Sequence, residues 1–120
     1  QRGIANSNIV LAGFSQGGAI ALHTALRQKQ ALAGVLALST YLPLQAKLAT
    51  QKTTESLNTP IFMAHGSFDE VITLERCKQS LTVLQENAYQ IEWHEYPMAH
   101  SVHQQEINDI RLFLQAVLIG

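Results

Sequence analysis

"LAGFSQGGAIAL", residues 11–22, passes from an apolar run through a cluster of glycines around one serine into a helix-like run. Residues 13–17 fit the pattern Gly-x-Ser-x-Gly, which places a serine on the sharp turn between a strand and a helix. Such a turn strains the serine backbone and points the hydroxyl out of the top of the sheet. We expect glycine at positions 13 and 17 because a Cβ at either would collide with neighbouring backbone. The pattern makes Ser15 a candidate nucleophile, with an ordinary Gly/Ser turn as the alternative.

The rest of the chain alternates between strand-like and helix-like patterns. The first three expected strands are nearly continuous apolar runs, typical of parallel strands covered on both faces, and the fourth alternates as an edge strand would. This order predicts an α/β fold with a mostly parallel sheet and flanking helices. Strands are expected at residues 8–14, 33–39, 60–66 and 89–97, and helices at 17–29, 44–50, 73–87 and 103–118.

Two of the expected helices carry an apolar stripe that should face the sheet. Cys77 lies on the first stripe, which indicates a core residue rather than a redox-active thiol. The first stripe consists of Leu74, Cys77, Leu81 and Leu84, and the stripe of the last helix consists of Ile107, Ile110, Leu114, Val117 and Leu118.

The composition narrows the class of protein. Of the 120 residues, 47% are hydrophobic and 14% are charged, with a net charge of −1. These values are typical of one globular domain, and the absence of a basic run argues against a nucleic-acid partner. The apolar stretch 32–44 is interrupted by polar residues and proline, so no transmembrane segment is expected. Cys77 is the single cysteine, which is compatible with a reducing compartment, and we expect a cytoplasmic location.

A nucleophilic serine needs a histidine base that is itself oriented by a carboxylate. In hydrolases built on this strand–turn–helix, the serine, the acid and the histidine follow one another in that order along the chain. Asp69 and Glu70 follow the third strand, and His100 and His103 follow the fourth, so all four lie on the same sheet edge as Ser15. We prefer Asp69 because a shorter side chain is more easily held in place. We prefer His100 because His103 should begin the last helix.

The other histidines fit the role of the base less well. His23 lies inside a helix, and His94 lies within a strand and should point at a face of the sheet. His65 precedes the acid and is expected to brace the turn that carries it. The spacing of His94, His100 and His103 matches no recognised ligand pattern, so no metal site is predicted.

Four segments together resemble one family of enzymes. They are "GFSQGGAIAL" (13–22), "LALSTYLP" (36–43), "HGSFDEVI" (65–72) and "YPMAHSV" (96–102). They look like signatures of the carboxylesterase, lysophospholipase and acyl-protein thioesterase branch of the α/β-hydrolase fold. The resemblance implies the C-terminal part of a three-layer α/β/α domain, in which the N-terminal strands and the oxyanion loop would precede residue 1.

The resemblance also implies roles for individual residues. Ser15 matches the nucleophile of the family, Asp69 the acid and His100 the base, and the backbone N–H of Gln16 matches one oxyanion donor. The second donor of the family comes from a His-Gly loop after an earlier strand, and nothing before Ser15 here supplies it.

The expected function is a serine hydrolase that cleaves small-molecule or lipid-like acyl esters or thioesters through an acyl-serine, with no cofactor. Tyr41 and Leu42 follow a strand at the active edge and are expected to line an acyl pocket, with plain loop packing as the alternative. A homodimer is a further expectation. The rival hypothesis is a non-catalytic α/β module for binding or assembly, in which the triad-like residues are idle. The 120 residues alone are expected to be inactive and poorly folded.

Overall fold

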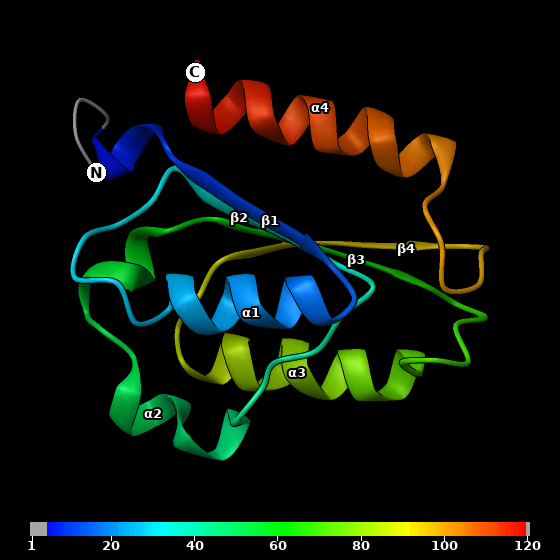
Figure 1. Cartoon of the computed structure of the whole chain (residues 1–120), viewed down its shortest axis with the longest axis horizontal. Coiled ribbons are helices and arrows are strands. Elements are labelled where there is room, and N and C mark those ends of the chain that lie inside the picture. Colours follow the sequence, from blue (N-terminus) through cyan, green and yellow to red (C-terminus); the bar gives the residue numbers. More distant parts are fainter. Residues whose placement is uncertain (1–4, 120) are drawn as a thin grey trace.

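Residues 5–119, which the computed structural model describes, form a four-stranded parallel sheet flanked by helices (Figure 1). The strands are β1 (Val10–Phe14), β2 (Gly34–Leu38), β3 (Ile61–Gly66) and β4 (Ile91–Tyr96). The helices are α1 (Gln16–Ala25), α2 (Leu48–Gln51), α3 (Leu74–Glu86) and α4 (Gln104–Leu118), with short 3-10 helices at Asn6–Asn8, Gln45–Lys47 and Glu55–Asn58.

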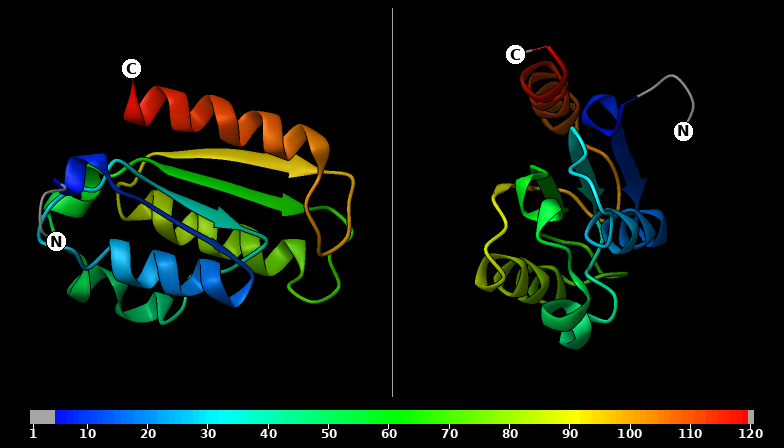
Figure 2. Two further views of the ribbon diagram at one scale, coloured as in Figure 1. Left: turned by 45° about the horizontal axis from the view of Figure 1, so that its top comes forward. Right: turned by 90° about the vertical axis from the view of Figure 1, so that its left-hand side faces the viewer.

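The strands lie side by side in the order in which they occur along the chain. Because all pairs are parallel, the carboxyl ends of the strands meet at one edge of the sheet, where Phe14 lies opposite Leu38 and Gly66 opposite Tyr96. The connections between strands place α1, α2 and α3 on one face of the sheet, and α4 lies on the other (Figures 1 and 2). The predicted α/β fold with three layers is confirmed.

Two apolar cores lie on the two faces of the sheet. Alternate residues of β2 and β3 enter opposite cores, so Val35 and Ile61 join the core under α1 and α3 whereas Phe62 joins the core under α4. Cys77 on α3 is fully buried in the first of these cores, and burial raises the pKa of its thiol to about 12. The expectation that Cys77 is a core residue is confirmed.

Among residues 5–119, none of the helices has the length and apolar character needed to cross a lipid bilayer.

The two outer strands are less buried than the inner pair. β4 is an edge strand, as its alternating pattern predicted, and β1 forms the opposite edge of the described sheet. The residues of β1 are at most half-buried and Ala12 is exposed, so residues 5–119 alone do not cover this strand on both faces. The reason is that α4 packs mainly on β2, β3 and β4.

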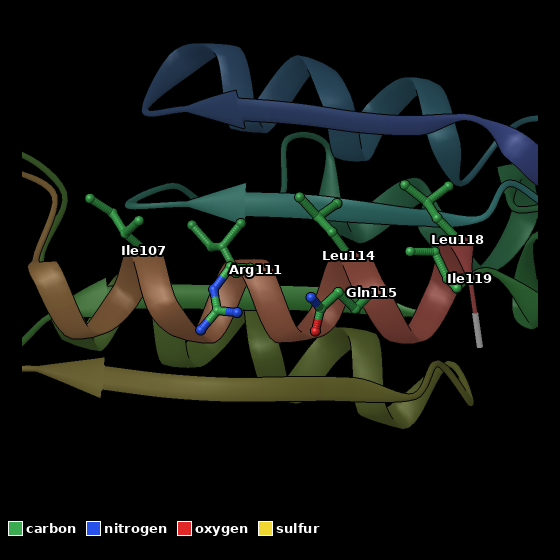
Figure 3. Close-up of a pocket in the computed structure, with 7 residues that line it drawn as sticks. Ile107, Arg111, Leu114, Gln115, Leu118 and Ile119 are labelled. Atoms are coloured by element: carbon green, nitrogen blue, oxygen red, sulfur yellow. The ribbon is translucent and has the colours of Figure 1, made fainter.

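The apolar stripe of α4 is only partly covered for the same reason. Ile110, Leu114 and Val117 pack against the core, but Ile107 and Leu118 are 50% and 45% exposed, contrary to expectation. The exposed part of the stripe borders a shallow groove of about 430 Å³ along the helix (Figure 3). The groove is lined by Ile107, Ile110, Arg111, Leu114, Gln115, Leu118 and Ile119.

Helix α1 is shorter than its sequence pattern predicted. It ends at Ala25 rather than at Lys29, because the chain tightens after Ala25 into turns in which Arg27 N–H and Gln28 N–H donate three residues back. The short helix expected near residues 44–50 is present as the 3-10 helix Gln45–Lys47 followed by α2.

Candidate active site

Ser15 occupies the turn between β1 and α1. Its backbone has φ 57° and ψ −123°, a conformation that costs a non-glycine residue about 1–3 kcal/mol. Two contacts hold the turn: Ser15 N–H donates to Leu38 O at 2.9 Å, and the hydroxyl of Thr40 donates to Ser15 O at 2.5 Å. The strained serine that the Gly-x-Ser-x-Gly pattern predicted is therefore present in the structure.

The glycines around Ser15 have different roles. A Cβ on Gly13 would lie 2.2 Å from the carbonyl carbon of Gly17, so the turn excludes any side chain at position 13. A Cβ on Gly17 would meet nothing within 4 Å, so the expected collision there is wrong. The backbone at the start of α1 packs directly against Gly13, so position 13 must lack a side chain, whereas position 17 need not. Gly18 has a role of its own, because a Cβ there would lie 2.7 Å from Cγ2 of Thr40.

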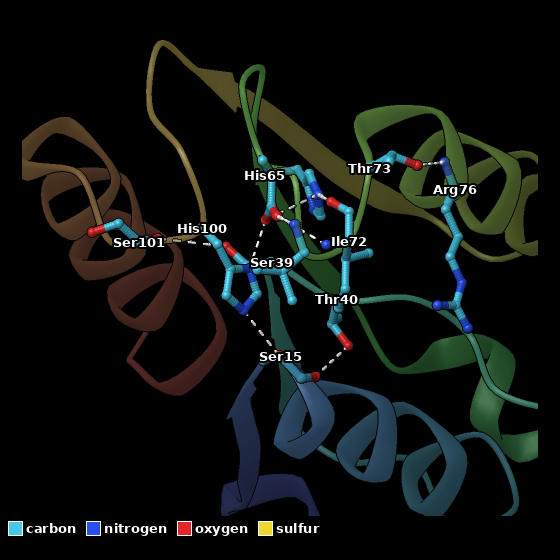
Figure 4. A network of polar contacts seen from close by, with 11 residues as sticks. Ser15, Ser39, Thr40, His65, Ile72, Thr73, Arg76, His100 and Ser101 are labelled. Carbon is cyan, nitrogen blue, oxygen red and sulfur yellow. Dashed lines mark hydrogen bonds and ion pairs between the residues drawn. The ribbon is translucent and has the colours of Figure 1, made fainter.

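His100 links Ser15 to Asp69. Its Nε2 lies 3.0 Å from Oγ of Ser15, and its Nδ1 lies 2.6 Å from Oδ2 of Asp69. Figure 4 shows the imidazole ring pointing at Ser15 from the loop that joins β4 to α4. The three side chains thus form one hydrogen-bonded chain from hydroxyl to carboxylate, although Ser15 and His100 are 85 positions apart in the sequence.

The loop that carries His100 depends on residues that sequence reasoning missed. A Cβ on Gly66 would lie 2.3 Å from Met98 O and 2.4 Å from Ala99 O, so glycine at the end of β3 lets this loop approach. The ring of Phe14 packs on the His100 ring with centroids 4.8 Å apart. The signal available for Gly66 was a glycine that ends a buried apolar strand next to the predicted acid.

Asp69 is 5% exposed and lies in a cage of donors. Its Oδ1 accepts from the N–H groups of Val71 and Ile72, both at 2.9 Å, while its Oδ2 accepts from His100. Burial alone would raise the pKa of Asp69, but the hydrogen bonds from His100, Ile72 and Val71 outweigh it and hold this pKa below its ordinary value. Asp69 is therefore an ionised carboxylate that faces His100.

Glu70 and His103, the alternative acid and base, are not part of the hydrogen-bonded chain from Ser15 to Asp69. Glu70 is exposed. His103 caps α4: its Nδ1 accepts from Gln105 N–H at 3.0 Å, and its own N–H donates to Glu106 at 3.1 Å. His94 stacks on Phe62 with ring centroids 5.0 Å apart, on a face of the sheet as predicted.

The residues predicted to contact substrate lie near the carboxyl edge in different environments. Gln16 opens α1, and the first N–H groups of a helix have no acceptor within the helix. Tyr41 is half-buried under the guanidinium of Arg76 and borders a hollow of about 230 Å³ that Gln16 also lines. Leu42 is buried in the core, and it borders a second hollow of about 410 Å³ that Tyr41 and Arg76 share.

The sequence pattern of the phospholipase/carboxylesterase family matches residues 1–118. The chain belongs to this family. Acyl-protein thioesterase 1 of Mycosarcoma maydis is 43% identical over 120 residues, covering 96% of this chain and 50% of that protein. Acyl-protein thioesterase 1 of Neurospora crassa is 42% identical over 115 residues, covering 93% of this chain and 47% of that protein.

Solved structures agree with this phospholipase/carboxylesterase assignment. Arabidopsis thaliana SOBER1 superimposes with a TM-score of 0.92 at 30% identity, over 97% of this chain and 56% of that one. Esterase PE8 gives a TM-score of 0.89 at 26% identity, over 97% of this chain and 53% of that one. The chain spans about half the length of the curated relatives it matches. The predicted resemblance is confirmed, whereas the catalytic roles of Ser15, Asp69 and His100 stay predictions.

Proposed function

We propose that this phospholipase/carboxylesterase chain carries the nucleophile, base and acid of a serine hydrolase that cleaves carboxylic esters or thioesters. The observation that carries the proposal is the continuous hydrogen-bonded chain from Oγ of Ser15 through His100 to Asp69. The strained backbone of Ser15 supports it, because such strain persists only where surrounding contacts maintain it and is concentrated at active sites.

The first half of the reaction forms an acyl-serine. Oγ of Ser15 attacks the acyl carbonyl while Nε2 of His100 takes its proton. Negative charge then develops on the carbonyl oxygen, where the N–H of Gln16 and the positive end of the α1 dipole stabilise it. The intermediate collapses as His100 returns the proton to the leaving alcohol or thiol, and the acyl group stays on Ser15.

The second half releases the acid. Water enters, His100 removes a proton from it, and the resulting nucleophile attacks the acyl-serine carbonyl. The bond to Ser15 breaks as His100 protonates Oγ. Throughout, Asp69 stays ionised because its pKa lies below the ordinary value, so it accepts a hydrogen bond from the Nδ1–H of His100 and stabilises the imidazolium.

The substrate class follows from the bond attacked and from the relatives. Esters and thioesters present the same acyl carbonyl to Ser15, so one set of residues serves both. Family membership supports ester substrates, and the name acyl-protein thioesterase 1 of the curated relatives supports thioesters. The hollow beside Gln16, lined in part by Ile20, Tyr41 and Pro43, offers an apolar surface for a lipid-like acyl group.

The test is labelling of the full-length protein with a fluorophosphonate probe, which reacts only with an activated serine. We expect the wild type and Ser67→Ala to be labelled and Ser15→Ala to stay unlabelled, because Ser67 bonds to Glu95 instead of His100. Hydrolysis of an acyl ester and an acyl thioester by Ser15→Ala should fall below about a hundredth of wild type. Labelling that survives Ser15→Ala would reveal another nucleophile. An unlabelled wild type would favour the rival hypothesis of a binding module with idle triad residues.

A further inference from the structure

His65 is a fully buried histidine that the proposed reaction does not use. It lies on β3, and its Nε2 is 2.7 Å from Ile72 O. A carbonyl oxygen only accepts hydrogen bonds, so Nε2 carries a hydrogen and donates it. The other ring nitrogen, Nδ1, is buried and has no hydrogen-bond partner among residues 5–119. A hydrogen on Nδ1 would be a buried donor without an acceptor, so the geometry favours the neutral ring protonated on Nε2 alone.

The hydrogen bond from His65 helps to hold the turn that carries Asp69. Ile72 N–H donates to Oδ1 of Asp69 at 2.9 Å, and Ile72 O accepts from His65. Both polar backbone groups of Ile72 are thereby used, one on the carboxylate and one on the buried imidazole (Figure 4). At the other end of the turn, Asp69 N–H donates to Gly66 O at 3.3 Å, so the turn is attached to β3 on both sides.

His65 also approaches the oxygen of Asp69 that orients the base. Its Nε2 lies 3.5 Å from Oδ2 of Asp69, the atom that accepts from His100 at 2.6 Å. The polar Nε2–H group therefore lies close to this oxygen, in a site where neither side chain is exposed to water. In such a site a dipole stabilises the ionised carboxylate more strongly than it would in water.

We propose that His65 is a positioning residue for the triad: as a neutral imidazole protonated on Nε2, it fixes the turn at residues 69–72 and thereby the carboxylate of Asp69 that orients His100. This inference rests on the proposed function. His65 is buried and would act on the proposed reaction through Asp69, without touching the substrate. Its loss should therefore affect the rate of the chemical step more than the binding of substrate.

The test compares two substitutions in the full-length protein. His65→Leu removes the donor, and we expect kcat to fall roughly ten- to a hundredfold with little change in KM, because misplacement of a catalytic group costs about this much. His65→Gln keeps an amide N–H donor and should recover most of the lost kcat. His94→Leu removes a histidine from the neighbouring strand, away from Asp69, and should leave kcat unchanged.

A measurement on the wild type does not depend on how the variants fold. The ¹⁵N chemical shifts of the His65 ring at neutral pH should show a proton on Nε2 and none on Nδ1. A ring protonated on Nδ1, or wild-type kcat in His65→Leu, would overturn this inference while fluorophosphonate labelling still supports the proposed function. A wild type that the probe does not label overturns both.

Discussion

Asp69 and Glu70 are adjacent carboxylates in different environments: Asp69 is buried and Glu70 is exposed. The length of the side chain was the only basis for preferring Asp69 from the sequence. The structure adds a stronger one, because the chain turns back after Asp69 so that two backbone N–H groups and His100 surround its carboxylate. Glu70 points into solvent. A carboxylate held by fixed donors can hold an imidazole in one tautomer, whereas an exposed one is free to rotate.

We expect Asp69→Asn to lower kcat of the full-length protein by about 10⁴-fold, because an amide favours the wrong imidazole tautomer. Glu70→Gln should change kcat by less than about twofold, since exposed charges contribute little. Steady-state hydrolysis of one acyl ester by the two variants decides between the adjacent positions. If Glu70→Gln is the damaged variant, Glu70 takes the role of the acid.

The junction between β1 and α1 shows how close packing decides which glycine of a motif is needed. The two glycines of Gly-x-Ser-x-Gly look equivalent in the sequence. In the structure Gly13 lies against the first turn of α1, whereas Gly17 faces open space. The same turn forces Ser15 to a positive φ, so the strain and the close contact belong to one piece of local geometry.

Matched alanine substitutions test this asymmetry. In Gly13→Ala the new Cβ would lie 2.2 Å from backbone that cannot move without opening the turn. We expect the free energy of unfolding to fall by about 1–3 kcal/mol or more, which outweighs the gain of about 0.4–1 kcal/mol from a less flexible unfolded chain. Gly17→Ala meets no atom and should leave stability unchanged or raise it by up to about 1 kcal/mol. Denaturant unfolding of the two full-length variants measures the difference, and equal losses would contradict the steric argument.

The two faces of the sheet are covered to different extents. Helices α1 and α3 cover one face from β1 to β4, whereas α4 covers mainly β2, β3 and β4 on the other face (Figures 1 and 2). Exposed apolar side chains remain on both sides of this gap: Ala12 on β1, and Ile107 and Leu118 on α4. Exposed apolar side chains next to an open strand edge favour association.

The 120-residue segment produced alone should therefore self-associate and bind a dye that reports exposed apolar surface. Ile107→Gln together with Leu118→Gln should reduce dye binding, because both residues line the groove on α4. Leu112→Gln is the matched control: Leu112 is 56% exposed on the same helix but lies outside the groove. A monomeric segment that unfolds cooperatively, binds no dye and hydrolyses esters would contradict this prediction.

The sequence alone was enough to predict the α/β class, the approximate position of every strand and the sheet edge on which Ser15, Asp69 and His100 meet. These follow from local rules: apolar periodicity defines the elements, and parallel strands bring their carboxyl ends to one edge. The Gly-x-Ser-x-Gly pattern likewise predicted the strained serine, because a turn between two adjacent elements is itself local.

The tertiary structure alone decided which atoms meet. The contact of Gly66 with the loop of His100, the hydrogen bond between His65 and Ile72 and the uncovered side of α4 depend on strand register and on the angle at which helices cross the sheet. These quantities join residues that lie far apart in the sequence, as in the hydrogen bond between Ser15 and His100 across 85 positions. No local pattern encodes them, because they result from packing all the side chains of both cores at once.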